Sequence, residues 1–188
     1  MKWLIAGLGN PEGKYFQTYH NVGFLVADEI AKKSGAEFRK KGNQMVADAP
    51  NALILKPLTY MNLSGQAVVA VMRKRGILPE NVIVICDDLA IDKGNIRVAF
   101  GGSSGGHNGL KSVTELTQTD KYIRVRVGIA PPKTIKGNTA NYVLSRIDGE
   151  SQPLLDQAID KAVAAVTAII SGEPLPKIQG AYNVKNSQ

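Results

Sequence analysis

The sequence predicts an α/β protein of one domain, in which helices flank a central, mixed, largely parallel twisted sheet. Short apolar runs occur along the chain together with patterns of helical period. The run at 82–86 consists of Val, Ile and Cys, which is typical of a central parallel strand buried on both faces. The chain has 188 residues, 44% of them hydrophobic and 21% charged, which is enough for one buried core.

The first half of the chain predicts strands and two helices in a clear order. Residues 2–7 form a short apolar run that ends in glycine, which favours a strand. Helical spacing follows from Asn21 up to Gly35, and a second helical pattern lies between Asn62 and Gly76. Between the two helices, residues 44–48 and 52–56 predict a pair of strands joined by a turn at 49–51.

The second half predicts two more strands and two more helices. Residues 95–100 and 122–129 alternate apolar and polar side chains, as strands with one polar face do. A helix is expected to start near Leu110, and a long amphipathic helix is expected over 151–171. The chain from Glu173 shows no periodic pattern. We therefore expect residues 1–188 to form one domain with 173–188 as a loosely ordered tail.

The charge of the chain is strongly positive, with a net charge of +7 and a pI of about 9.5. Positive side chains gather at residues 39–41, 73–75, 121–126 and 133–136. A polyanionic partner such as a nucleic acid would fit this charge. Many basic proteins bind no nucleic acid, so the charge supports a function inferred from other features and does not decide it.

Cysteine content and hydrophobicity limit the protein class. Cys86 is the only cysteine and lies in an apolar run, so we expect a buried, inert thiol. No apolar run approaches the roughly 20 residues that span a bilayer, and the apolar start is too short for a signal peptide. We expect a cytoplasmic protein that does not bind a membrane.

Only two histidines are present, His20 and His107, and each precedes an asparagine near predicted bends. Asn10, Asp87 and residues 101–108 each follow a predicted strand, where sites form in open α/β sheets. His20 could reach this edge and donate one ring N–H to Asp87, which leaves the other nitrogen to take a proton from water. The alternatives are a structural role for His20 at a helix start and for Asp87 in a turn.

Other site classes fit the sequence less well. Two histidines with Asp87 and Asp88 could bind a metal, but no HxH or HxxxH pair is present, so we expect none. Residues 7–13 miss the dinucleotide fingerprint, and no G-x-S-x-G motif occurs. Residues 101–109 contain five glycines, which fit either a ligand-binding loop before a helix or, as composition favours, a flexible connection.

Several separated motifs together resemble the bacterial-type peptidyl-tRNA hydrolases. They follow the family order over essentially the whole chain and include GLGNP at 7–11, HN at 20–21, MNLSG at 61–65, DDL at 87–89, GGSSGGHNGL at 101–110 and RVRVGI at 124–129. The resemblance implies a monomeric α/β enzyme without a cofactor, which cleaves the ester between a peptide and the 3′ end of tRNA. The expected partner is peptidyl-tRNA, met at its acceptor end and T-arm backbone.

The resemblance also implies residue roles. His20 would be the general base that activates water, Asp87 would orient it, and Asn10 and Asn62 would position the terminal adenosine, the substrate carbonyl and the water. Asn108 would contact the substrate as well. The resemblance further places Met61 and His107 along the cleft, Tyr15 at its wall, and Arg126 and either Lys133 or Lys136 against the tRNA.

Three positions depart from the family pattern, namely Glu12, Tyr19 and Ala90. They put loop details in doubt and leave the implied reaction in place. An RNA-binding relative without hydrolysis is the main alternative, and the set Asn10, His20 and Asp87 favours the enzyme. A nicotinamide-dependent oxidoreductase is disfavoured because the dinucleotide fingerprint fails.

Overall fold

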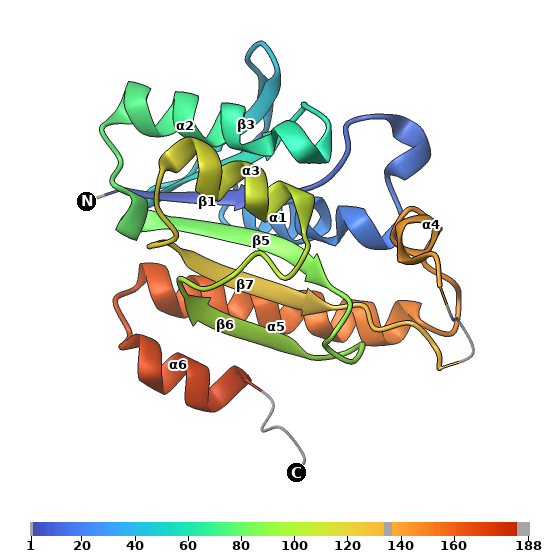
Figure 1. The fold of residues 1–188 in the computed structure, drawn as a ribbon. Coiled ribbons are helices and arrows are strands. Elements are labelled where there is room, and N and C mark those ends of the chain that lie inside the picture. The colour runs from blue at the N-terminus through green and yellow to red at the C-terminus, as the bar shows by residue number, and fades with distance from the viewer. Residues whose placement is uncertain (1, 134–136, 184–188) are drawn as a thin grey trace.

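The computed structural model describes residues 2–133 and 137–183, and it confirms the predicted α/β class (Figure 1). A seven-stranded sheet has the order β2-β3-β4-β1-β5-β7-β6. The strands are β1 Trp3–Gly7, β2 Arg39–Lys40, β3 Gln44–Asp48, β4 Ala52–Pro57, β5 Val82–Asp88, β6 Ile96–Phe100 and β7 Ile123–Gly128. The α-helices are α1 Val22–Lys33, α2 Ser64–Arg75, α3 Asn108–Thr117, α4 Thr139–Val143, α5 Gln152–Ile170 and α6 Leu175–Tyr182.

The centre of the sheet is parallel. Strand β1 pairs in parallel with β4 on one side and with β5 on the other, and β5 also pairs in parallel with β7. Strands β2, β3 and β6 join antiparallel at the two edges. The chain therefore leaves β1 for one side of the sheet and reaches β5 on the other, which places a topological switch point at the carboxyl ends of β1 and β5.

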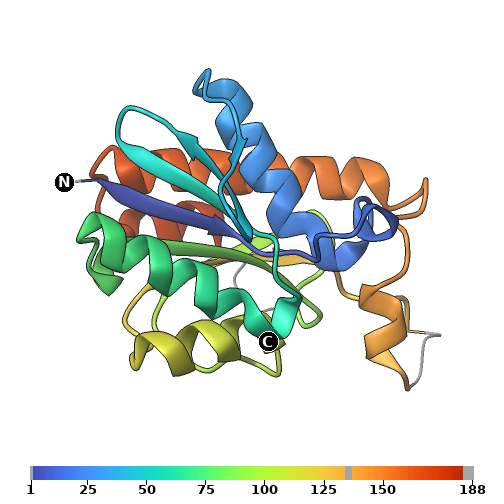
Figure 2. The same ribbon diagram turned by 90° about the horizontal axis from the view of Figure 1, so that it is seen from above.

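Alternate side chains along the strands separate two cores. Ile5, Ile83 and Ile85 pack on the side of α1 and α5, whereas Leu4 and Val84 pack on the side of α2 and α3. Figure 2 shows the two helix pairs on opposite faces of the sheet. Burial on both faces explains why β1 and β5 read as continuous apolar runs in the sequence.

Helix α1 lies very close to the central strands. A Cβ added to Gly23 would lie 2.5 Å from the carbonyl oxygens of Leu8 and Ile85. Only glycine permits this approach, and it brings the start of α1 directly against the ends of β1 and β5. The short 3-10 helix η2 Tyr19–Asn21, which carries His20, precedes α1 and is therefore fixed beside the same strand ends.

Two sequence expectations are corrected by the structure. The polar face of strand β7 is less solvated than expected, because Arg124 is completely buried and Arg126 is only partly exposed; the edge strand β6 alternates as expected. The tail is ordered at 175–183, because Ile178 of α6 is buried and the Asn183 amide pairs with both backbone polar groups of Val98. Residues 184–188 of the predicted tail lie outside the described residues.

Cys86 is buried as expected, and burial raises the pKa of its thiol well above the usual range. None of the helices in residues 2–133 and 137–183 combines the length and the apolar character that a bilayer crossing requires.

Candidate active site

A cleft of about 780 Å³ opens at the carboxyl ends of β1 and β5. Its walls come from the 3-10 helix η3 Met61–Leu63, from the glycine-rich segment before α3, and from α4, which stands beyond the ends of β5 and β7 in Figure 1. Among the residues lining it are nine expected from the sequence: Asn10, Tyr15, His20, Met61, Asn62, Asp87, His107, Asn108 and Arg126.

Asn10 is fixed by hydrogen bonds on three of its polar groups. Its backbone N–H donates to Asn21 Oδ1 at 2.9 Å, and its carbonyl accepts from Asn21 Nδ2 at 2.9 Å. Its side-chain Oδ1 accepts from the backbone N–H of Met61, also at 2.9 Å. These bonds leave Asn10 Nδ2, the donor end of the amide, without a partner in the described part of the chain. Asn21, for which the sequence predicts no separate role, holds Asn10 in place.

His20 and Asp87 form the expected hydrogen bond. His20 Nδ1 lies 2.8 Å from Asp87 Oδ1, and an ionised carboxylate can only accept, so the imidazole carries its proton on Nδ1. In the neutral imidazole, Nε2 of His20 then carries no proton, and no described residue bonds to it. This nitrogen is on a residue lining the cleft, so the histidine can accept a proton from a molecule bound there.

His107 lines the cleft as expected, and its ring also makes hydrogen bonds that the sequence did not predict. Its Nδ1 accepts from the backbone N–H groups of Gly109 and Leu110, at 3.1 and 3.2 Å, and so caps helix α3. The proton of the neutral ring must therefore be on Nε2, which donates to Asp87 Oδ1 at 3.0 Å. Both ring nitrogens therefore take part in hydrogen bonds within the protein, and His107 stabilises the ionised carboxylate of Asp87.

Asp87 is almost fully buried and is surrounded by these two donors. Burial alone would raise the pKa of its carboxyl group, but the interactions with His107 and His20 outweigh burial and hold the pKa well below its usual range. The carboxylate is therefore ionised at neutral pH and keeps the His20 imidazole in the tautomer with a free Nε2.

The same three residues could be considered as metal ligands, because their ligand atoms lie within 4.8 Å of one another. A metal on His107 Nε2 would move the ring proton to Nδ1. That proton would face the N–H groups of Gly109 and Leu110, which already point at Nδ1. The donor set therefore suits a hydrogen-bonded His–Asp–His arrangement better than a metal site.

The glycine-rich segment is held by two arginines of β7. Arg124 Nη1 and Arg126 Nη2 both donate to the carbonyl of Ser103, and Arg126 Nη1 also pairs with Asp88 Oδ2 at 3.0 Å. Asp120 accepts from the N–H of Gly102 at 3.0 Å. The basic cluster at 121–126 thus serves the cleft wall in part, because the completely buried Arg124 cannot reach a polyanion at the surface.

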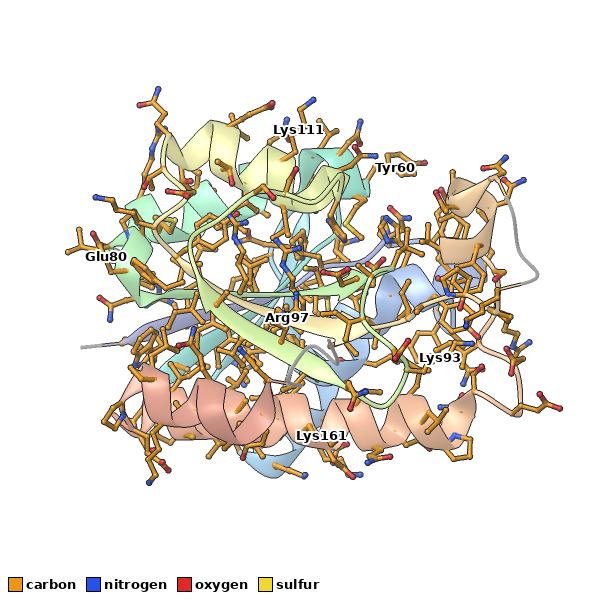
Figure 3. The ribbon with its side chains drawn as sticks, turned by 60° about the horizontal axis from the view of Figure 1, so that its bottom comes forward. Tyr60, Glu80, Lys93, Arg97, Lys111 and Lys161 are labelled. Atoms are coloured by element: carbon orange, nitrogen blue, oxygen red, sulfur yellow. The ribbon has the colours of Figure 1, made fainter. Side chains whose placement is uncertain are left out.

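Helix α4 is tied to the residue before His20. The Tyr19 ring stacks on Tyr142 of α4 with centroids 4.7 Å apart, and its hydroxyl donates to Asp148 Oδ2 at 2.7 Å. Lys93, seen beside α5 in Figure 3, donates to the Tyr19 hydroxyl and to Ser151. Tyr19, one of the three expected departures from the family pattern, links the loop that carries His20 to the α4 wall.

Glu12, the second expected departure from the family pattern, lies at the outer rim. Glu12 accepts from the Tyr60 hydroxyl at 2.8 Å and pairs with Lys14 at 3.1 Å. The hydrogen bond from Tyr60 and the pair with Lys14 lower the pKa of Glu12. Tyr60 projects toward α4 in Figure 3 and lines the cleft, so Glu12 fixes one side chain of the rim. The third departure, Ala90, also lines the cleft.

One of the two lysines expected to meet tRNA can be placed. Lys133 is exposed and does not line the cleft. Lys136 lies outside the described residues.

Comparison with known proteins decides the family. The family model described as peptidyl-tRNA hydrolase matches residues 4–188. The chain belongs to this family. A peptidyl-tRNA hydrolase of Thermodesulfovibrio yellowstonii is 39% identical over 186 residues, which are 96% of this chain and 98% of that protein. One of Listeria welshimeri is 39% identical over 185 residues, 96% and 99% of the two chains.

Solved peptidyl-tRNA hydrolases have the same fold. The crystal structure of the Acinetobacter baumannii protein superposes with a TM-score of 0.88 at 34% identity, covering 96% of this chain and 95% of that one. A peptidyl-tRNA hydrolase crystallised with N-propanol superposes with a TM-score of 0.89 at 33% identity, covering 99% and 97%. The resemblance stated from the motifs is thereby confirmed.

Proposed function

We propose that this chain hydrolyses the ester bond between a peptide and the 3′ end of tRNA, with water activated by His20 and without a cofactor. The observation that carries the proposal is the 2.8 Å hydrogen bond between His20 Nδ1 and Asp87 Oδ1, which leaves Nε2 free on a cleft-lining residue. Family membership supplies the substrate class.

In the proposed reaction, His20 Nε2 takes a proton from water while the water oxygen attacks the ester carbonyl. The tetrahedral intermediate then breaks its bond to the ribose 3′ oxygen, which receives the proton from His20. The products are a peptide acid and a tRNA with a free 3′ hydroxyl. The ionised Asp87 stabilises the imidazolium form of His20 between the two steps.

The amide groups of three asparagines are the proposed hydrogen-bond donors to the substrate. The free Nδ2 of Asn10 is available for the carbonyl oxygen or the terminal adenosine, and Asn62 and Asn108 are exposed residues that line the same cleft. An ester has a better leaving group than an amide, so a held water and oriented donors suffice without a covalent nucleophile. All these groups come from one chain, which supports action as a monomer.

The tRNA body would bind outside the cleft through phosphate contacts. Positive side chains can follow an A-form backbone without reading base edges, which would allow many tRNAs to be accepted. We propose Arg126 and Lys133 or Lys136 for contacts to the acceptor end and T-arm. Arg126 is suited to a position at the cleft edge, because it already has a fixed orientation from Asp88.

The test is His20→Ala with a short peptidyl-tRNA as substrate. We expect kcat to fall by roughly 10²–10⁴, the range for loss of a general base, while affinity for the uncharged tRNA stays unchanged. The measurement combines a peptide-release assay with a tRNA binding titration. Turnover near that of wild type would refute the base assignment, and a wild-type protein that binds tRNA without releasing peptide would identify a binding protein instead.

A further inference from the structure

A second cavity of about 400 Å³ lies between the end of α2 and the β2–β3–β4 edge of the sheet. It shares no lining residue with the catalytic cleft. Figure 1 shows the C-terminal end of α2 at the opposite end of the molecule from α4. Helix α2 has 12 residues, so about 18 Å separates this end from Ser64, which adjoins the cleft residues of η3.

The cavity has an apolar floor and a cationic rim. Val46, Leu53 and Val71 form the floor and are buried. Lys41, Lys74 and Arg75 line the rim, while no carboxylate side chain does. We call this site the basic pocket.

The rim cations are available to a ligand. Within residues 2–133 and 137–183, no ion pair is formed by Lys41, Lys74 or Arg75. The nearby carboxylate of Asp48 forms its ion pair with Lys2 and has only longer-range electrostatic interactions with Lys41 and Arg75. The basic pocket therefore keeps an uncompensated positive charge.

Two basic clusters far apart in the sequence meet here. Residues 39–41 end β2 and begin its turn, and residues 73–75 end α2. Arg39 is the direct cross-strand partner of Val46, so its side chain is on the same face of the sheet as the pocket floor. The proposed hydrolysis uses neither cluster, which leaves their convergence unexplained by that function.

We propose that the basic pocket binds a nucleotide, with its phosphate on Lys41, Lys74 and Arg75 and its base and sugar against the apolar floor. A guanidinium matches phosphate oxygens in a two-pronged arrangement, and lysine ammonium groups add point charges. The nucleotide is either free in solution or an unpaired residue of an RNA strand; both present the same chemistry. This site is independent of ester hydrolysis in the cleft.

The experiment follows backbone amide NMR shifts of the full chain during titration with AMP, a six-nucleotide single-stranded RNA, and inorganic phosphate. We expect saturable shifts at residues 41–46 and 71–76 with AMP or RNA. An RNA that binds at least about 10-fold more tightly than AMP identifies RNA as the source, and equal or weaker RNA binding identifies free nucleotide. Phosphate binding as tightly as AMP, or shifts confined to the cleft, would overturn the proposal.

The variant Lys74→Gln/Arg75→Gln should raise the Kd at the basic pocket at least about 10-fold. Lys111→Gln/Lys121→Gln, which removes the same charge from exposed positions elsewhere, is the matched control and should leave this Kd unchanged. An equal Kd for wild type and the pocket variant would overturn the site. Peptide release by the pocket variant should stay at the wild-type level, so failure of this proposal is separable from failure of the hydrolase proposal.

Discussion

The two histidines have different roles because their second ring nitrogens face different groups. His20 leaves Nε2 to the cleft, whereas His107 uses Nδ1 to cap α3 and Nε2 to hold Asp87. The sequence predicts the His20–Asp87 pair, because Asp87 follows the end of one strand and His20 lies on the loop that follows another strand at the same edge of the sheet. It does not predict the His107 bond, because a glycine-rich segment can approach a site in many ways and only the capped start of α3 selects this one.

His107→Ala should lower kcat with little effect on KM, since it removes a donor to Asp87 and both ring nitrogens of His107 are already bonded within the protein. With one donor lost, the negative charge of Asp87 is less compensated and stabilises the imidazolium form of His20 more strongly. The acid limb of the kcat against pH profile, which reports protonation of the base, should therefore move to higher pH. Asn108→Ala is the control, because it should raise KM and leave that limb in place. An unchanged acid limb in His107→Ala would contradict the assigned role.

Asp87 should also make stability depend on pH in a defined direction. The pKa of its carboxyl group is lowered in the folded protein, whereas an unfolded aspartate ionises near pH ~3.9. Its contribution to stability is therefore fully present above about pH 5 and is lost as the pH falls toward the lower folded pKa. The difference in unfolding free energy between wild type and Asp87→Asn, measured with urea, should shrink on acidification. A constant difference would contradict this linkage.

Short elements determine the shape of the cleft, and they are the least predictable from sequence. Helix α4 has five residues and no amphipathic repeat, so its pattern is too short to detect. It is positioned by contacts that are distant in sequence, chiefly the Tyr19–Tyr142 stack. Helix α6 escaped prediction for a similar reason, since only Ile178 of its eight residues is buried.

Tyr19→Phe should loosen α4 and keep the aromatic stack. The change removes the hydroxyl that donates to Asp148 and accepts from Lys93, which should lower the unfolding free energy by about 1 kcal/mol. We expect a few-fold fall in kcat/KM in a peptide-release assay, because α4 walls the cleft. Tyr182→Phe, at the end of α6, is the control for hydroxyl loss. If kcat/KM falls equally in both variants, Tyr19 has no special link to the cleft.

The architecture of the whole molecule was largely predictable, because it depends on long patterns. The continuous apolar run at β5 predicts its central parallel position, and Gly76 predicts the end of α2, where its φ is +62°. The alternation of polar residues along β7 gave too high an expected exposure for its polar face. Arg124 is buried, with its guanidinium carbon 4.7 Å from the centroid of the Tyr122 ring, and it donates to the Ser103 carbonyl. A pattern of residue types does not reveal that a charged side chain has an internal partner.

The overall positive charge predicts a salt-sensitive substrate interaction. Lys133→Gln/Lys136→Gln should raise KM for peptidyl-tRNA several-fold and flatten its dependence on salt, because fewer counterions are released on binding. The measurement is KM at several salt concentrations. Lys32→Gln/Lys33→Gln, at the end of α1, removes equal charge and should leave both quantities unchanged. A salt dependence equal to that of wild type in the first variant would exclude these lysines as tRNA contacts.

The pairing of Asn183 with Val98 has a consequence for self-association. Edge strands expose unpaired N–H and C=O groups to which a second copy can add its own strand. At β6 the Asn183 amide occupies both backbone groups of Val98, as an added strand would. The opposite edge, β2, has only two residues, and both are exposed cations that repel an identical edge. Each end of the sheet is thus protected against aggregation, one by a side-chain amide that imitates a strand and the other by shortness and charge.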